Sequence, residues 1–173
     1  LSRLLSENTD DNLNEDQIES AKVIQSSGTS LLSLIDEILD LSKIEAGKME
    51  LEYQHVKLSD VTQELNSLFA PIVKEKALDL NIVVQPDLDS TIETDRLRLD
   101  QVLRNLLSNA IKFTSKGSIT LTITEEQNNR NNIVFAVQDT GIGIAEEKQK
   151  IIFEAFQQAD GSTRRKFGGT GLG

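Results

Sequence analysis

The stretch Asn105-Leu-Leu-Ser-Asn109-Ala-Ile-Lys112-Phe-Thr ends a predicted amphipathic helix over residues 96–113. Asn105 and Asn109 are four positions apart on this helix and therefore share one face, and Lys112 lies beside them. An amide oxygen is a hard, neutral ligand that suits Mg²⁺, and an ammonium group can contact a phosphate oxygen. The face thus has the chemistry of a metal–phosphate site, although an isolated pair of asparagines is more often a solvated polar surface.

Two glycine-rich blocks follow this helix, Asp139-Thr-Gly141-Ile-Gly143-Ile144 and Gly168-Gly169-Thr170-Gly171-Leu172-Gly173. Glycine lets the backbone approach a ligand closely, and successive backbone N–H groups can cradle a phosphate. Asp139 ends a predicted strand and can accept a hydrogen bond from an exocyclic amine. Taken alone, the first block is more typical of an ordinary turn. Neither block continues into the Lys-Ser or Lys-Thr pair of a P-loop.

Hydrophobic periodicity predicts an α+β fold in which a helical hairpin precedes a two-layer α/β sandwich. Asp16 is the expected N-cap of a long helix that runs to Ile44, and Ser59 or Asp60 is the expected cap of a helix that reaches Lys76. The other predicted elements are extended segments over 49–53 and 56–58, strands over 78–84, 91–94, 117–125 and 133–139, and a short helix over 146–153.

The long helix has too much apolar surface to be stable alone in water. Its apolar positions alternate steps of three and four, as in a coiled coil. We therefore expect a helical hairpin that dimerises into a four-helix bundle. The positions of this seam are Ala21, Ile24, Gly28, Leu31, Ile35 and Ile38.

The composition excludes several classes of protein. A formal net charge of −10 argues against non-specific binding to nucleic acid. The chain has no cysteine, which excludes disulfides and thiolate metal sites and fits a reducing compartment. No run of about 18 apolar residues is present, so we expect no membrane contact by this chain.

The three polar and glycine-rich blocks together resemble the ATP-binding domain of sensor histidine kinases, in the wider family that includes gyrase, Hsp90 and MutL. The resemblance covers nearly the whole chain, and residues 95–114 resemble the N box of these kinases over its full length. It implies a two-layer sandwich with a mixed sheet over residues 49–173, preceded by a dimerisation and phosphotransfer hairpin over residues 1–48. Residues 38–48 resemble the end of the second hairpin helix, in a form common among hybrid kinases with attached receiver domains.

The resemblance also assigns roles to residues. It implies that Asn109 is the main Mg²⁺ ligand, that Asn105 supports it, and that Lys112 contacts phosphate of ATP. Asp139 would accept a hydrogen bond from the adenine amino group and so select ATP over GTP. The further nucleotide contacts that it implies are Phe113, Gly141, Gly143, Ile144, Phe156, Gly169, Thr170, Gly171, Leu172 and Gly173.

Residues Arg164, Arg165 and Lys166 form the densest cationic run in an acidic chain. Such a run is usually a solvated surface. Because it precedes a phosphate-type glycine block, we expect it to clamp the β- and γ-phosphates. Phe153 and Phe156 resemble the phenylalanine box of the family, and their spacing equally suits core packing.

The residue types favour a kinase over an ATPase. Related ATPases carry a water-activating Glu at the position of Asn105, and an amide cannot act as a general base at pH 7. His55, the single histidine, is far in sequence from the hairpin. The resemblance implies that the phosphoacceptor histidine lies before Leu1, and that the chain is the cytoplasmic part of a larger bacterial sensor, with or without a membrane anchor. The implied partners are a second copy and a response-regulator receiver domain. The alternatives are an ATPase of the same fold and a non-catalytic dimerising pseudokinase.

Overall fold

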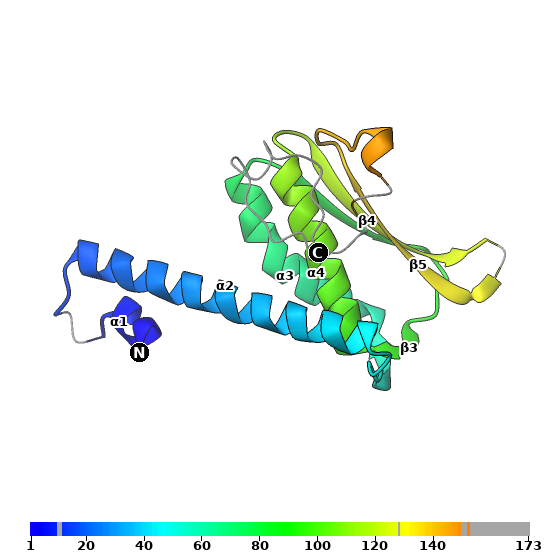
Figure 1. The fold of residues 1–173 in the computed structure, drawn as a ribbon. Coiled ribbons are helices and arrows are strands. Elements are labelled where there is room, and N and C mark those ends of the chain that lie inside the picture. Colours follow the sequence, from blue (N-terminus) through cyan, green and yellow to red (C-terminus); the bar gives the residue numbers. More distant parts are fainter. Residues whose placement is uncertain (10–11, 128, 150–151, 153–173) are drawn as a thin grey trace. The chain divides into compact units, whose positions relative to one another are not determined.

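A computed structural model describes residues 1–9, 12–127, 129–149 and 152. The chain divides into two compact units, of which the first comprises Leu1–Glu50 and the second begins at Leu51 (Figure 1). The first unit contains α1 (Ser2–Glu7) and α2 (Glu15–Glu45). The elements of the second unit are β1 (Tyr53–Lys57), α3 (Leu58–Glu75), β2 (Asp79–Val84), β3 (Thr91–Asp95), α4 (Arg96–Phe113), β4 (Ser118–Glu126), β5 (Asn129–Asp139) and a 3₁₀ turn over Glu146–Lys148.

The long helix α2 begins two residues earlier than predicted. Its N-cap is Asn14, not Asp16: the Asn14 side chain accepts a hydrogen bond of 2.9 Å from the Gln17 backbone N–H. The Gln17 side chain in turn accepts one of 3.0 Å from the Asn14 backbone N–H. This reciprocal capping box satisfies two N–H groups that the first helical turn leaves without partners, which is why the cap lies at Asn14. Beyond the other end, Gly47 has a φ of +64°.

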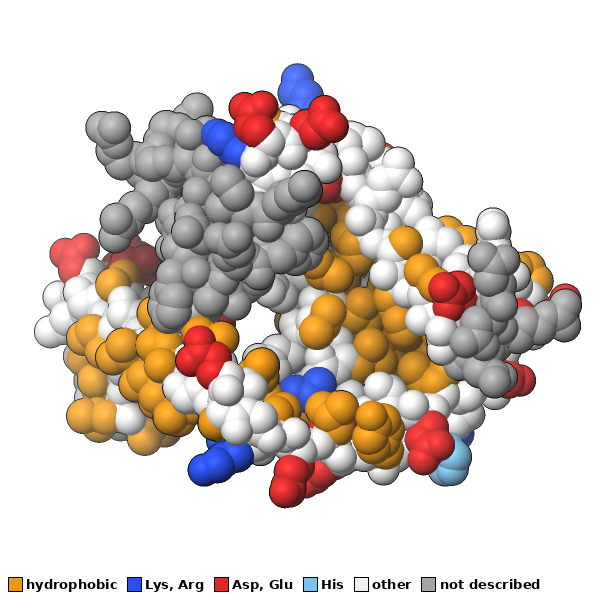
Figure 2. All heavy atoms as spheres, turned by 45° about the vertical axis from the view of Figure 1, so that its right-hand side comes forward, with side chains coloured by type: hydrophobic (Ala, Val, Ile, Leu, Met, Phe, Trp, Pro, Cys, Tyr) orange, Lys and Arg blue, Asp and Glu red, His pale blue; other side chains and the backbone are white. Residues whose placement is uncertain are grey.

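Most apolar side chains of α2 are exposed in the first unit. Helix α1 packs against the first half of α2, where Ser6 Oγ donates to Gln25 Oε1 at 3.1 Å and Ala21 is buried. Figure 2 shows hydrophobic side chains exposed along the helical unit between charged ones. The exposed apolar residues of α2 are Val23, Ile24, Leu31, Leu32, Ile35, Ile38, Leu39 and Ile44.

The second unit is a two-layer sandwich with a mixed sheet, as predicted. Its three-stranded sheet has the order β2-β4-β5, with β2 parallel and β5 antiparallel to β4. Strands β1 and β3 form a separate antiparallel pair. Helices α3 and α4 lie side by side and cover one face of the sheet (Figure 1).

The core fixes the orientation of α4. Its Leu103 and Leu107 are fully buried in one cluster with Ile119, Leu121 and Ile123 of the central strand β4. Burial of each such side chain contributes about 1.5–3 kcal/mol. Because one face of α4 is held in this core, its opposite polar face, which carries the two asparagines, has a defined direction.

Two predicted boundaries near the start of the second unit are wrong. Helix α3 begins at Leu58, directly after β1, with Lys57 at the N-cap position and no side-chain cap; neither Ser59 nor Asp60 caps it. The Leu58 backbone N–H donates instead to the Ser90 carbonyl at 2.9 Å, a tertiary contact that replaces a local cap. In place of the two predicted extended segments, 49–53 and 56–58, the chain has the single strand Tyr53–Lys57, because these residues pair with β3.

The remaining boundaries agree with the prediction to within a few residues, and α4 spans the predicted residues 96–113. Pro71 lies inside α3, as expected. The described part of the predicted helix over 146–153 contains the 3₁₀ turn. Among the described helices, none is long and apolar enough to cross a membrane.

Candidate functional site

A buried carboxylate anchors the start of α4. Asp95 Oδ1 accepts a hydrogen bond of 3.0 Å from the Arg98 backbone N–H, and Oδ2 accepts one of 3.0 Å from the backbone N–H of Glu52. These bonds from Arg98 and Glu52 hold the pKa of Asp95 below its ordinary value, because they favour the ionised form. Asp95 therefore caps the helix and ties it to the segment that enters β1.

Ion pairs fasten the first half of α4 to α3. Glu64 of α3 accepts from Arg96 Nη2 at 2.6 Å and from the Arg104 guanidinium. Asp100 accepts from Arg96 Nε at 2.7 Å. Burial opposes the charge of Arg96, but the hydrogen bonds and charges of Asp100 and Glu64 outweigh it and raise its pKa. These contacts hold the helix that carries the candidate site.

The two asparagines of α4 contact each other. Asn109 Nδ2 donates a hydrogen bond of 2.9 Å to Asn105 Oδ1, and both side chains are half-buried. This bond fixes the orientation of the Asn109 side-chain amide. The Asn109 Oδ1 atom takes no part in it and is a candidate ligand. A neutral oxygen with a fixed direction is the kind of ligand that Mg²⁺ prefers.

Lys112 lies on the same stretch of α4, one turn beyond the asparagines. Its ammonium nitrogen is 5.2 Å from the centroid of the Phe113 ring, a distance at which the face of the ring attracts a cation. Both side chains are half-buried. The predicted phosphate contact is thus brought close to the predicted metal ligands by the helix itself.

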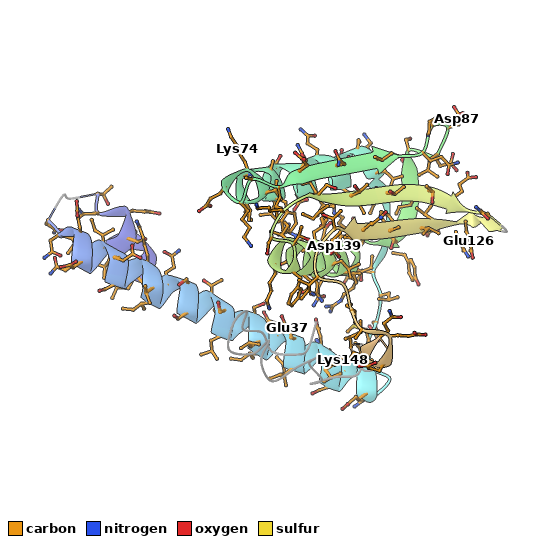
Figure 3. The ribbon with its side chains drawn as sticks, turned by 90° about the horizontal axis from the view of Figure 1, so that it is seen from above. Glu37, Lys74, Asp87, Glu126, Asp139 and Lys148 are labelled. Carbon is orange, nitrogen blue, oxygen red and sulfur yellow. The ribbon has the colours of Figure 1, made fainter. Side chains whose placement is uncertain are left out.

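The segment after β5 docks on the last turn of α4 (Figures 1 and 3). The Ile142 backbone N–H donates to the Phe113 carbonyl oxygen at 3.3 Å. A Cβ on Gly141 would lie 2.4 Å from that same oxygen, closer than any side chain could come. Gly141 is therefore required for this contact, which joins the two predicted blocks although they are separated by two strands.

The structure brings in two residues that the sequence analysis did not single out, Gly117 and Thr140. Thr140 Oγ1 accepts a hydrogen bond of 3.0 Å from the Ser118 backbone N–H. A Cβ on Gly117, whose φ is +112°, would lie 2.2 Å from Thr140 Oγ1. Together Gly117 and Thr140 fix the start of β4 to the end of β5. The sequence feature that could have pointed to Gly117 is its position directly before a strand with strongly alternating residues.

Asp139 lies at the end of β5, beside α4 (Figure 3). Its Oδ1 accepts a hydrogen bond of 2.8 Å from the Gly141 backbone N–H, and the side chain is exposed. The bond orients the carboxylate while Oδ2 keeps its capacity to accept. Gly143 has a φ of +68°, a backbone conformation that favours glycine, and Ile144 is half exposed.

Thr114 directly follows α4 and is buried, with 3% of its surface exposed. Its Oγ1 has no hydrogen-bond partner among the described residues. A hydroxyl in this condition is costly, and it lies next to the helix end on which the glycine block docks. The described part of the chain contains no cluster of three or more His, Cys, Asp or Glu side chains that could hold a metal ion.

Several predicted site residues lie outside the described residues, and their predicted roles stay predictions. They are Phe153, Phe156, Arg164, Arg165, Lys166, Gly169, Thr170, Gly171, Leu172 and Gly173. His55 lies on β1, opposite Glu93 of β3, in an exposed position.

Residues 94–173 match the family model described as histidine kinase-, DNA gyrase B- and HSP90-like ATPase. The sensor histidine kinase GacS of Pseudomonas protegens is 43% identical over 159 residues, which are 91% of this chain and 17% of that protein. The autoinducer 2 sensor kinase/phosphatase LuxQ of Vibrio vulnificus is 39% identical over 176 residues, 100% of this chain and 20% of that protein. The chain thus spans about a fifth of the length of these relatives.

Solved structures of histidine kinases have the same fold. Full-length ShkA in complex with AMPPNP is 33% identical, with a TM-score of 0.76, and the match covers 99% of this chain and 34% of that one. The histidine kinase ThkA in complex with the response regulator TrrA is 26% identical, with a TM-score of 0.61, over 85% of this chain and 42% of that one.

Proposed function

We propose that this chain, whose residues 94–173 match the family model of histidine kinase-, DNA gyrase B- and HSP90-like ATPases, is the catalytic part of a sensor histidine kinase. In this proposal it binds Mg·ATP, and the γ-phosphoryl group passes to a histidine other than His55 and then to an aspartate of a response regulator. The observation that carries the proposal is that the Asp139–Gly143 block docks on Phe113, at the end of the helix that carries the hydrogen-bonded pair Asn105 and Asn109.

The donor set at this helix end fits Mg²⁺. The metal would be held by Asn109 Oδ1, with Asn105 orienting that amide, and by phosphate oxygens and water, since Mg²⁺ prefers oxygen ligands and retains several waters. When bound, Mg²⁺ would neutralise charge on the phosphates. Lys112, one turn further on, would add a cation for the same phosphates, so this part of the site works by positioning and charge neutralisation.

The chemistry of Asn105 supports a kinase rather than an ATPase. Its amide accepts the hydrogen bond from Asn109 and cannot take up a proton from an attacking water at pH 7. Without a general base there, hydrolysis should be slow and the γ-phosphoryl group should persist until a histidine nitrogen attacks it. The cationic run Arg164–Lys166 would hold the β- and γ-phosphates during that transfer.

The orientation of Asp139 supports selection of adenine. One carboxylate oxygen is held by the Gly141 backbone N–H at 2.8 Å, and the other would accept a hydrogen bond from the exocyclic amine of adenine. Guanine presents a carbonyl at that position, so two acceptors would face each other and the pair would be left unmatched. The glycines at 141 and 143, with Ile144, would line the base, as would Phe113 and Phe156.

The exposed apolar side chains of α2 support dimerisation. A helix of 31 residues with eight large exposed apolar side chains is unstable in isolation, and two such hairpins would bury them in a four-helix bundle. A receiver domain would be the second partner, in keeping with the response regulator TrrA seen with ThkA. An activity that uses ATP implies a cytoplasmic location.

The deciding experiment uses the full protein that contains this chain, incubated with Mg²⁺ and γ-labelled ATP. Protein-bound label that is acid-labile and base-stable identifies phosphohistidine, and its loss in Asn109→Ala ties it to the predicted metal site. Asp87→Asn, an exposed change in the turn before β3, is the matched control and should retain the label.

Two other results would replace the proposal. Steady release of free phosphate without protein-bound label would identify an ATPase of the same fold. Absence of both signals, together with absence of Mg-dependent ATP binding by calorimetry, would leave a non-catalytic dimerising module.

A further inference from the structure

The groove between α3 and α4 is closed at one end and open at the other. At the closed end Glu64 of α3 bridges Arg96 and Arg104 of α4. Further along the same helices, toward their C-terminal ends, the groove opens into a hollow of about 180 Å³. The residues that line it are Phe69, Ile72 and Lys76 from the end of α3, and Ser108, Ile111 and Lys112 from the end of α4.

The hollow has an apolar floor and a cationic rim. Phe69 and Ile111 are buried at its base, whereas Ile72 is 41% exposed at its edge. Lys76 Nζ donates to the Ile111 carbonyl oxygen at 3.1 Å, which holds one ammonium group at the rim, and Lys112 supplies a second cation. The six described lining residues include no acidic side chain, although the chain as a whole carries a net charge of −10.

The size of the hollow decides between classes of ligand. Sites for drug-sized molecules usually enclose about 300–1,000 Å³, so this hollow is too small for one. A cavity of about 150 Å³ accommodates a benzene ring, so the hollow matches one aromatic or large aliphatic side chain. Residues that carry most of the binding energy at an interface typically fill small, well-packed pockets, as one apolar side chain would do here.

We propose that this hollow is a docking site for an acidic peptide segment of a partner protein, which inserts one aromatic side chain between α3 and α4. The inserted ring would lie on Phe69 and Ile111. Carboxylates on either side of it in the peptide would meet the Lys76 and Lys112 ammonium groups. The hollow shares Lys112 with the predicted phosphate contacts but contains none of Asn105, Asn109 and Asp139, and its occupation needs neither nucleotide nor metal.

The test is a titration of the ¹⁵N-labelled 173-residue chain with three blocked peptides, without nucleotide or Mg²⁺. The first peptide is Glu-Asp-Phe-Asp-Glu, the second replaces its acids by Gln and Asn, and the third replaces its Phe by Ser. With the first peptide we expect saturable shifts of the amide signals of Ile72, Ser108 and Ile111. The other two peptides should bind at least tenfold more weakly.

Matched variants locate the binding on the protein. Lys76→Glu should weaken the first peptide at least tenfold, whereas Lys74→Glu, the same change at an exposed position of α3 outside the hollow (Figure 3), should alter it less than twofold. Ile72→Gln removes the apolar side chain at the edge of the hollow but retains both lysines, and it should also weaken binding of the first peptide. Unchanged signals from Ile119, Leu121 and Ile123 show that each variant is folded.

Four outcomes would overturn the proposal. They are absence of shifts at the hollow up to millimolar peptide, equal binding of all three peptides, equal effects of Lys76→Glu and Lys74→Glu, and the same shifts produced by inorganic phosphate alone, which would make the hollow a simple anion site. Asn109→Ala should leave peptide binding intact. Failure of the proposed nucleotide site and failure of the docking site can therefore be told apart, because peptide binding is measured without nucleotide.

Discussion

The Asn109 side chain donates a hydrogen bond of 2.9 Å to the Asn105 side chain, one turn earlier on α4. The two residues therefore have unequal parts in the proposed site: Asn109 Oδ1 is the candidate ligand, and Asn105 sets its direction. This inequality could not be obtained from their spacing, which treats both amides alike. It leads directly to a pair of variants with different expected results.

Replacement of Asn105 should weaken the proposed metal site, and replacement of Asn109 should remove it. Outer partners that orient a ligand typically contribute 10–100-fold to metal affinity, so Asn105→Ala should lower Mg-dependent ATP affinity by about tenfold or more. Asn109→Ala should abolish the difference between titrations with Mg²⁺ and with EDTA. Calorimetry measures both, with Ser108→Ala as the control on the neighbouring helix face. Equal losses in the two variants would contradict the unequal roles.

Replacement of Asp139 should reduce discrimination between ATP and GTP. Asp139→Asn keeps the shape of the side chain but turns an amide donor or a weaker acceptor toward the adenine amine, and an unmatched polar edge costs about 1–3 kcal/mol. We expect ATP affinity to fall by at least about tenfold and GTP affinity to change little. Competition binding against a fluorescent ATP analogue measures both, and Asp87→Asn serves as the control. Parallel loss of both nucleotides would show that the change disturbed the fold instead.

Addition of a methyl group at Gly141 should destabilise the second unit. The new Cβ would lie 2.4 Å from the Phe113 carbonyl oxygen and 2.9 Å from its carbon, and overpacking of this kind costs about 1–3 kcal/mol. Gly28→Ala, the same chemical change on α2 with no atom within 4 Å of the new Cβ, should be neutral or stabilising by up to about 1 kcal/mol. Urea unfolding of both variants checks this, and equal stability of Gly141→Ala and the parent chain would contradict the close contact.

Ionisation of Asp95 should make the stability of the second unit pH-dependent. Its pKa in the folded state lies below the ordinary value of 3.8, because the backbone N–H groups of Arg98 and Glu52 favour the carboxylate. The unfolded chain therefore takes up the proton first as the pH falls. The stabilisation is complete above the ordinary pKa and is lost as the pH falls through the folded-state pKa.

We therefore expect Asp95→Asn to unfold at a lower temperature than the parent chain at pH 7. The difference between the two should shrink as the pH falls below 3.8. Thermal unfolding followed by circular dichroism across pH 7 to 2.5 measures it, with Asp87→Asn as the control. A difference that stays constant with pH would mean that the Asp95 charge does not contribute.

Local patterns were sufficient for elements whose signal lies within their own residues. Helix α4 has the predicted bounds because apolar positions at helical spacing meet the core, and Asp95 precedes it as a cap. Strand β4 follows its alternation, with Ile119, Leu121 and Ile123 on the buried side. Two boundary predictions failed where a distant partner decides the boundary: the Ser90 carbonyl at the start of α3 and the pairing of β1 with β3 lie more than thirty positions away. The predicted cap of α2 failed for a local reason, because Asn14 and Gln17 form a capping box that the prediction did not include.

The sequence by itself determined the residue types of the proposed site and their resemblance to the ATP-binding domain of sensor histidine kinases, because those depend on chemistry and order along the chain. Only the tertiary structure decided how distant residues meet: that Gly141 must be glycine because Phe113 O lies against it, and that Gly117 and Thr140 fix two strands together. The hollow between α3 and α4 likewise arises only from packing. Contacts of this kind join residues far apart in sequence, and their geometry is fixed by the shared core, which no local pattern contains.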